Sequence, residues 1–134
     1  MEETSVRVYR KHICRFVNIY REKNTEVVGI LNSMMQGDAR SLYVELLLPG
    51  DVVVEPKDVA DVEITLGLLS KTYGEGQLSF INGVWVFPLT QSETLALRAT
   101  VQKVQVRVRW PSGEIEGVFA GRIYIDESLS RKEI

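Results

Sequence analysis

Alternation of apolar and polar residues is the clearest pattern in the chain. Across residues 104–110 the even positions are apolar and the odd positions are polar, with Trp110 closing the run. A period of two is typical of a strand with one buried face. Residues 111–113 (Pro-Ser-Gly) predict a turn, and a second strand is expected over residues 114–126. Gly117 and Gly121 interrupt that strand and predict a bulge that shifts its alternation.

Asn82 and Gly83 stand between two apolar runs and predict a β-hairpin. Both residues tolerate the positive φ that a two-residue type I′ turn requires. The register that follows gathers large apolar side chains on one face, which we expect in the core: Leu78, Phe80, Trp85, Phe87 and Leu89. Pro88 lacks a backbone donor, so this stretch is expected at a sheet edge or leaving the sheet.

Shorter signals predict the remaining elements. Residues 90–93 (Thr-Gln-Ser-Glu) form a capping box, which predicts a short helix near residues 91–97. Residues 61–66 alternate and residues 42–48 are mostly apolar, so both predict strands. Residues 5–9 and 13–20 are further candidate strands, although polar residues interrupt the inward face of the second.

Together these elements predict an all-β fold, an antiparallel β-sandwich of about seven to nine strands with one short helix. A parallel α/β architecture needs helices of about 10–15 residues between strands, and no segment has the apolar period for one. We expect residues 35–126 to form the sandwich domain and residues 127–134 a polar C-terminal tail. Residues 1–34 are expected to be either an N-terminal arm or additional strands.

Composition narrows the class of protein. The 134 residues include 16 Lys and Arg against 18 Asp and Glu, and 45% are hydrophobic. These values fit one globular domain and exclude a disordered or collagenous chain. The near-neutral charge argues against a nucleic-acid partner, because binding by counterion release needs a basic face. No apolar run approaches the roughly 20 residues that span a bilayer, and the acidic start is unlike a secretory signal, so no membrane partner is expected.

From Met35 onward the sequence resembles small structural proteins of tailed bacteriophages and of prophages in Gram-positive gut bacteria. The matching phrases are residues 35–42 (MQGDARSL), 58–65 (DVADVEIT), 83–94 (GVWVFPLTQSET), 104–108 (VQVRV) and 123–128 (IYIDES). The resemblance covers about 100 of the 134 residues and leaves residues 1–34 outside. It implies an immunoglobulin-like sandwich that builds or decorates the virion, of the type found in tails and baseplates, assembled in the bacterial host cytoplasm. No catalytic motif comes with it.

Two residues raise the question of nucleophilic chemistry. His12 and Cys14 are two positions apart on a candidate strand, so they could share a face and form a thiolate–imidazole pair. The sequence identifies neither an oxyanion donor nor an orienting group, so a buried Cys beside a surface His is the preferred interpretation. A zinc site needs three or four ligands, and the chain has one His and one Cys. We therefore expect no catalytic residues, no metal and no cofactor.

Carboxylates in close succession are a second candidate, for glycoside hydrolysis or calcium binding. They are Asp58, Asp61, Glu63, Glu114 and Glu116. Each falls at a strand end or at an outward position, which favours a solvated face over a site. Residues 74–76 (Gly-Glu-Gly) lack the Lys and the Ser or Thr of a phosphate-binding loop and predict a turn.

The candidate assembly surface has two parts. Lys103, Arg107 and Arg109 form a basic stripe on the outer face of one strand, which either docks an acidic partner or discourages edge pairing. The first third of the chain adds apolar side chains, namely Val6, Val8, Ile13, Phe16, Val17 and Ile19. These either add strands to the chain's own sheet or reach across to a neighbouring subunit by strand addition.

These observations predict a non-catalytic structural component of a bacteriophage virion, homo-oligomeric and in contact with other phage structural proteins. The alternative is an immunoglobulin-like binding module whose loops recognise a carbohydrate or a host surface, with Tyr73 as the loop aromatic. An enzyme ranks third, and a small-molecule ligand is not expected.

Overall fold

The structure is a computed structural model that describes residues 5–9, 14–20, 33–48, 50 and 52–134, the first two ranges by their backbone alone. This part of the chain contains twelve strands, one 3₁₀ turn and one α-helix. They are β1 (Ser5–Tyr9), β2 (Cys14–Tyr20), β3 (Ser33–Met35), β4 (Arg40–Glu45), β5 (Leu47–Leu48), β6 (Val52–Val53), η1 (Pro56–Asp58), β7 (Asp61–Leu66), β8 (Leu69–Thr72), β9 (Ser79–Ile81), β10 (Val84–Leu89), α1 (Gln91–Ala96), β11 (Val101–Arg109) and β12 (Ile115–Asp126). The predicted all-β class is confirmed.

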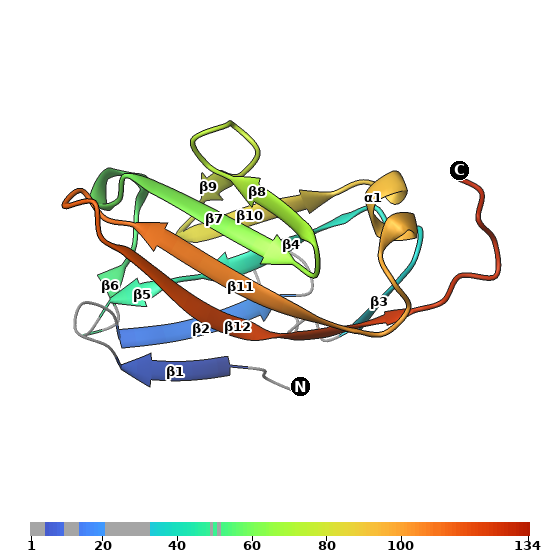
Figure 1. Ribbon diagram of the computed structural model, residues 1–134, viewed down its shortest axis with the longest axis horizontal. Helices are drawn as coiled ribbons and strands as arrows, with labels where there is room; N and C mark the ends of the chain where they lie inside the picture. The colour runs from blue at the N-terminus through green and yellow to red at the C-terminus, as the bar shows by residue number, and fades with distance from the viewer. Residues whose placement is uncertain (1–4, 10–13, 21–32, 49, 51) are drawn as a thin grey trace.

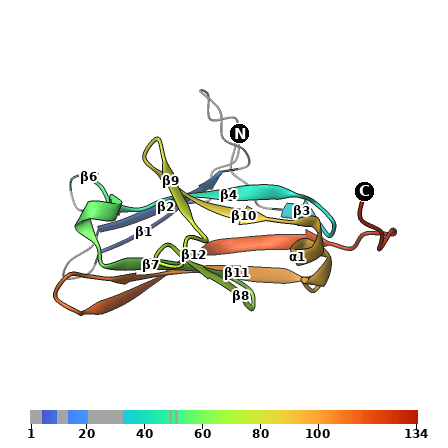
Figure 2. The ribbon, with the colours of Figure 1, turned by 90° about the horizontal axis from the view of Figure 1, so that it is seen from above.

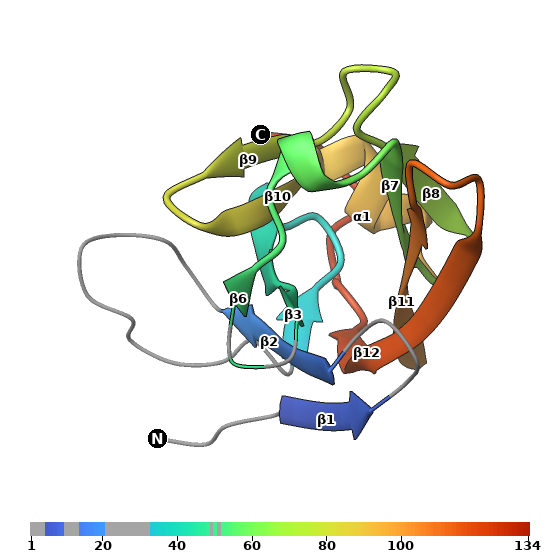
Figure 3. The same ribbon diagram turned by 90° about the vertical axis from the view of Figure 1, so that its left-hand side faces the viewer.

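Two five-stranded sheets form the body of the molecule (Figure 1). The first sheet has the order β1-β2-β4-β10-β9 and the second has the order β3-β12-β11-β7-β8, while β5 and β6 pair separately. Figure 2 shows strands of the two sheets in separate layers, and Figure 3 shows them from one end. One cluster of buried side chains from both sheets fills the space between them, including Trp85 and Phe87 from the first and Ile64, Val106 and Ile123 from the second.

The predicted hairpin has the expected turn and register. Asn82 and Gly83 have φ values of 49° and 82°, and Trp85 pairs with Phe80. Trp85 and Phe87 are fully buried, so the aromatic face lies in the core as predicted. Pro88 pairs with β4 but lies beyond the part of β10 that β9 covers, which fits its missing donor.

The predicted bulge lies at Gly121. The register of β11 and β12 shifts there, since Val104 pairs with Gly121 while the next residue, Gln105, pairs with Phe119. Gly121 has φ 151°, and the buried positions change from even numbers before it to odd numbers after it. Both Val118 and Ile123 therefore point into the core.

Two details of the predicted fold are wrong. The sheets are not wholly antiparallel, because β3 pairs with β12 in parallel, and the strands outnumber the predicted seven to nine. β3, β5 and β6 are two or three residues long, too short to show a period in the sequence. Met34 in β3 is buried, so the division expected at residue 35 falls within a strand.

The chain ends join this framework. β1 and β2 extend the first sheet, where Ile19 on β2 pairs with Val44 on β4. The residues after β12 are mostly exposed but not detached, because Arg131 Nη1 lies 2.7 Å from Gln36 Oε1 and Arg131 Nη2 lies 2.8 Å from the carbonyl oxygen of Leu95. The polar tail is thus held against Gln36, which follows β3, and against α1.

Candidate functional site

The basic stripe of β11 lies on the outer face of the second sheet. Lys103, Arg107 and Arg109 are exposed, and the valines between them are buried. Arg107 Nε lies 2.7 Å from Glu63 Oε1 on the neighbouring strand β7. This hydrogen bond and the attraction of Glu63 raise the pKa of Arg107. Asp61 stands opposite Arg109, so the stripe meets carboxylates on its β7 side.

An apolar area borders the stripe on its other side. Phe119 and Tyr124 on β12 are 38% and 48% exposed, and Val101 on β11 stands opposite Tyr124. The guanidinium of Arg122 lies 5.2 Å from the centre of the Phe119 ring, within cation–π range. We call Val101, Phe119, Arg122 and Tyr124 the outer patch. These outward aromatics were not among the residues predicted from the sequence, although the alternation along residues 114–126 indicates them.

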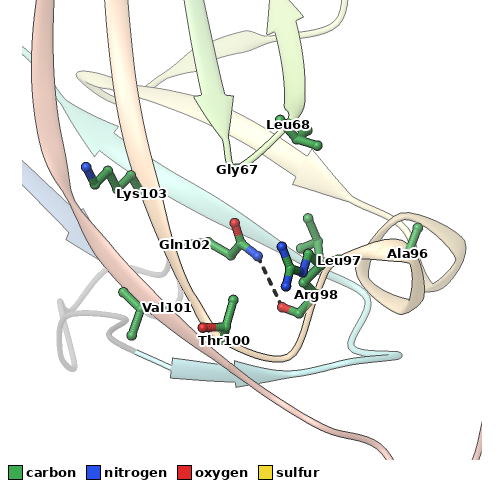
Figure 4. A pocket seen from close by; sticks show the side chains of 9 residues that line it. All are labelled: Gly67, Leu68, Ala96, Leu97, Arg98, Thr100, Val101, Gln102 and Lys103. Atoms are coloured by element: carbon green, nitrogen blue, oxygen red, sulfur yellow. Dashed lines mark hydrogen bonds between the residues drawn. The ribbon is translucent and has the colours of Figure 1, made fainter.

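A pocket opens at one end of the second sheet, where the β7–β8 turn approaches the connection from α1 to β11 (Figure 4). We call it the end pocket; its volume is about 430 Å³. Its lining is Gly67, Leu68, Ala96, Leu97, Arg98, Thr100, Val101, Gln102 and Lys103. Leu97 is buried, Val101 is half-exposed and Leu68 is 98% exposed. Apolar side chains therefore stand beside the exposed cations of Arg98 and Lys103.

Short-range contacts fix the shape of the end pocket. The Gly67 amide donates to the carbonyl oxygen of Lys103 at 2.9 Å, and Gln102 Nε2 donates to that of Arg98 at 3.2 Å. Gly67 has φ +61°, and a Cβ atom there would lie 2.5 Å from Gln102 Oε1. The positive φ of the turn therefore favours glycine here, and a larger residue would also displace the end of the Gln102 side chain. Of the residues that line the end pocket, only Lys103 was predicted from the sequence to belong to a functional surface. The pocket brings together segments that are distant in the chain, and the sequence does not show that they meet.

The candidate carboxylates hold local structure. Asp61 Oδ1 accepts the amides of Val62 and Gly74, both at 2.8 Å, and Asp58 Oδ2 accepts the amide of Glu55 at 3.0 Å. Glu116 Oε1 accepts a hydrogen bond from Trp110 Nε1 at 2.8 Å. Each carboxylate thus serves a turn or a side-chain contact of its own.

Glu114 lies in the β11–β12 turn, where its backbone carbonyl accepts the amide of Trp110 at 2.8 Å. Residues 74–76 form the predicted turn. In the described part of the chain, no group of three or more His, Cys, Asp or Glu side chains is placed to hold a metal ion.

Two of the predicted features lie wholly or partly outside the described residues. His12 and Ile13 lie outside the described residues, and so does the side chain of Cys14 on β2. The side chains of Val6, Val8, Phe16, Val17 and Ile19 also lie outside them, so their assembly role stays a prediction. Tyr73, the loop aromatic named for the alternative binding module, packs edge-on against the core residue Trp85, with ring centres 5.3 Å apart.

Comparison with known proteins finds no family model, no curated protein and no solved structure that matches the chain. Within the described residues, no helix has the length and hydropathy to cross a membrane.

Proposed function

We propose that this protein is a non-catalytic structural component of a bacteriophage virion, in the tail, the baseplate or a decorating layer. The outer patch is the observation that carries the proposal. Its aromatic side chains leave apolar area in water beside cations, which is typical of surfaces that become buried on association. The sequence resemblance from Met35 onward supports the same function and gives the class of partner, other phage structural proteins.

We further propose that the two facing sheets are an immunoglobulin-like sandwich. The chain crosses between the sheets repeatedly, from β4 to β7, from β8 to β9 and from β10 to β11. Such crossings are typical of sandwiches with Greek-key connections. The parallel pairing of β3 with β12 extends the second sheet beyond its antiparallel strands.

The test combines the purified chain with the products of the neighbouring phage genes. The double variant Phe119→Ser, Tyr124→Ser removes the exposed aromatics and should leave the core intact, because both side chains point outward. Val52→Ser is the matched control, because Val52 is 54% exposed on β6. We expect the double variant to lose co-purification and the control to keep it. Equal co-purification of both variants would contradict the proposal.

A second candidate function has the same outer patch in its favour. Exposed aromatics on the outer face of a sheet also suit an immunoglobulin-like binding module, in which Phe119 and Tyr124 stack against sugar rings. Binding of the unmodified chain to host-surface glycans, lost in the double variant while co-purification with phage proteins persists, would favour this module.

A further inference from the structure

The end pocket lies at the start of strand β11, and the β11–β12 turn lies at its end. The first residues of the strand line the end pocket, and its last residue, Arg109, leads into the turn of residues 110–114. Figure 1 shows this turn at one end of the long axis and α1, beside the pocket, toward the other. The pocket and the turn therefore lie at opposite ends of one molecule.

The end pocket combines an apolar lining with positive charge. Leu68, Leu97 and Val101 supply the apolar side chains. Arg98 and Lys103 form no ion pair with any residue that the structure describes, so their charges face solvent. A fitting occupant has an apolar projection with a carboxylate beside it.

The β11–β12 turn has these properties. We call residues 110–115 the hairpin tip. Backbone hydrogen bonds of 2.8 Å join Trp110 N to Glu114 O and Gly113 N to Trp110 O. Pro111 and Ile115 are exposed apolar residues, and Glu114 carries an exposed carboxylate that accepts a hydrogen bond from the Ser112 hydroxyl at 3.4 Å. A tip closed by its own hydrogen bonds loses little conformational freedom when it docks.

The surroundings of the hairpin tip add negative charge. The Ala60 amide donates to the carbonyl oxygen of Arg109 at 2.7 Å, which holds the segment after η1 beside the tip. Asp58 and Asp61 flank that segment. Lys57 in η1 and Arg109 beside the tip are exposed cations at the same end. Together with Glu114, the two aspartates outnumber them, so this end carries an excess of carboxylates opposite the cations of the pocket.

We propose that the hairpin tip of one copy docks in the end pocket of a second copy, so that copies of this chain associate head to tail. Apolar tip residues contact Leu68 and Val101, and Glu114 approaches Arg98 and Lys103. A contact between two different surfaces of the same chain is heterologous and builds a ring or a filament. The inference rests on the proposed function, since it names one of the contacts through which the virion component assembles.

The first experiment measures self-association by sedimentation velocity over a range of protein and salt concentrations. Leu68→Ser should raise the dissociation constant by about tenfold or more, because a Leu side chain no longer becomes buried. Leu129→Ser is the matched control, since Leu129 is equally exposed on the tail, and it should leave association unchanged. Salt should weaken association of the unmodified chain. A chain that stays monomeric throughout, or equal effects of the two substitutions, would overturn the inference.

The second experiment reverses charges. Arg98→Glu with Lys103→Glu changes the pocket, and Ser112→Lys with Glu114→Lys changes the tip. Each pair alone should abolish association, and all four substitutions in one chain should restore it, while Lys132→Glu in the tail should have no effect. Failure of the combined variant to associate, with its thermal midpoint unchanged, would overturn the pairing. A monomeric chain that still joins neighbouring phage proteins overturns this inference alone, whereas self-association without any such partner contradicts the proposed function alone.

Discussion

Lys71 and Glu93 form an ion pair that joins the second sheet to helix α1. Lys71 Nζ on β8 lies 2.9 Å from Glu93 Oε2 and 3.0 Å from Oε1 on α1. The same ammonium donates to the carbonyl oxygen of Pro88 at 2.7 Å and lies 5.4 Å from the centre of the Phe87 ring. The edge of the second sheet is thereby tied to β10 of the first and to the helix that follows it.

Substitution of Lys71 should therefore destabilise the fold. Lys71→Met keeps most of the side-chain volume but leaves Glu93 and the Pro88 carbonyl without this donor, at a cost of about 1–2 kcal/mol in the free energy of unfolding. Lys57→Met is the control, because the ion pair of Lys57 with Glu55 is 3.9 Å long and well exposed. Urea denaturation measures both. A cost no larger than that of the control would contradict the joining role.

The stability that Glu93 contributes should depend on pH. Burial raises the pKa of Glu93, but hydrogen bonds from the Thr90 backbone and from Lys71, with the charge of Lys71, outweigh it and leave the pKa below the usual 4.5. The folded state thus binds this proton less readily than the unfolded state. The stabilisation is present above the unfolded pKa and is lost as the pH falls through the lower folded pKa.

Glu93→Gln tests this dependence. The difference in unfolding free energy between the unmodified chain and Glu93→Gln should be largest near neutral pH and should shrink in acid, as measured by urea denaturation at a series of pH values. Glu75→Gln, on an exposed turn, is the control substitution. A difference that stays constant from neutral pH to well below 4 would show that the charge of Glu93 is unimportant.

Trp85 should be the most costly side chain to truncate. It is almost completely buried, its Nε1 donates to the Val54 carbonyl at 3.1 Å, and its ring centre lies 5.0 Å from that of Phe80. Trp85→Ala should lower the free energy of unfolding by about 3–5 kcal/mol. Leu68→Ala, at an exposed position, should change it little. A neutral Trp85→Ala, or solvent-exposed fluorescence from Trp85, would mean that the hairpin register is wrong by one residue.

Gln36 should control how firmly the tail is held. It is buried, and its Nε2 donates to the Leu97 carbonyl at 2.8 Å while its Oε1 accepts from Ser128 N and Arg131 Nη1. Gln36→Leu leaves these groups without partners and should cost about 1–3 kcal/mol. Amide hydrogen exchange in residues 127–134 should accelerate. Gln105→Leu, on the exposed face of β11, is the control, and equal exchange in both variants would argue against the role of Gln36.

Local sequence signals predicted those parts of the fold that local physics determines. The φ preferences of Asn82 and Gly83 set one hairpin, the Thr90 and Glu93 side chains cap the helix, and the alternation of β11 sorts its two faces. No local sequence signal indicated which distant segments would pair as strands. The parallel contact of β3 with β12 joins residues about ninety positions apart, and three residues cannot display a period.

The same limit applies to the candidate surfaces. The alternation indicated the basic stripe, but not that Glu63 would pair with Arg107, since that depends on the register between β7 and β11. The end pocket arises where the turn at Gly67 meets the segment after α1. Both segments look like ordinary loops in the sequence, so their joint chemistry becomes visible only in the folded chain.

Native mass spectrometry of the purified chain, alone and mixed with the products of the neighbouring genes, tests the proposed assembly function most directly. We expect multiples of the single-chain mass at high protein concentration and mixed complexes with at least one neighbouring product. The mixed complexes should disappear in the Phe119→Ser, Tyr124→Ser variant and persist in Val52→Ser. A single-chain mass at every concentration and in every mixture would contradict the account.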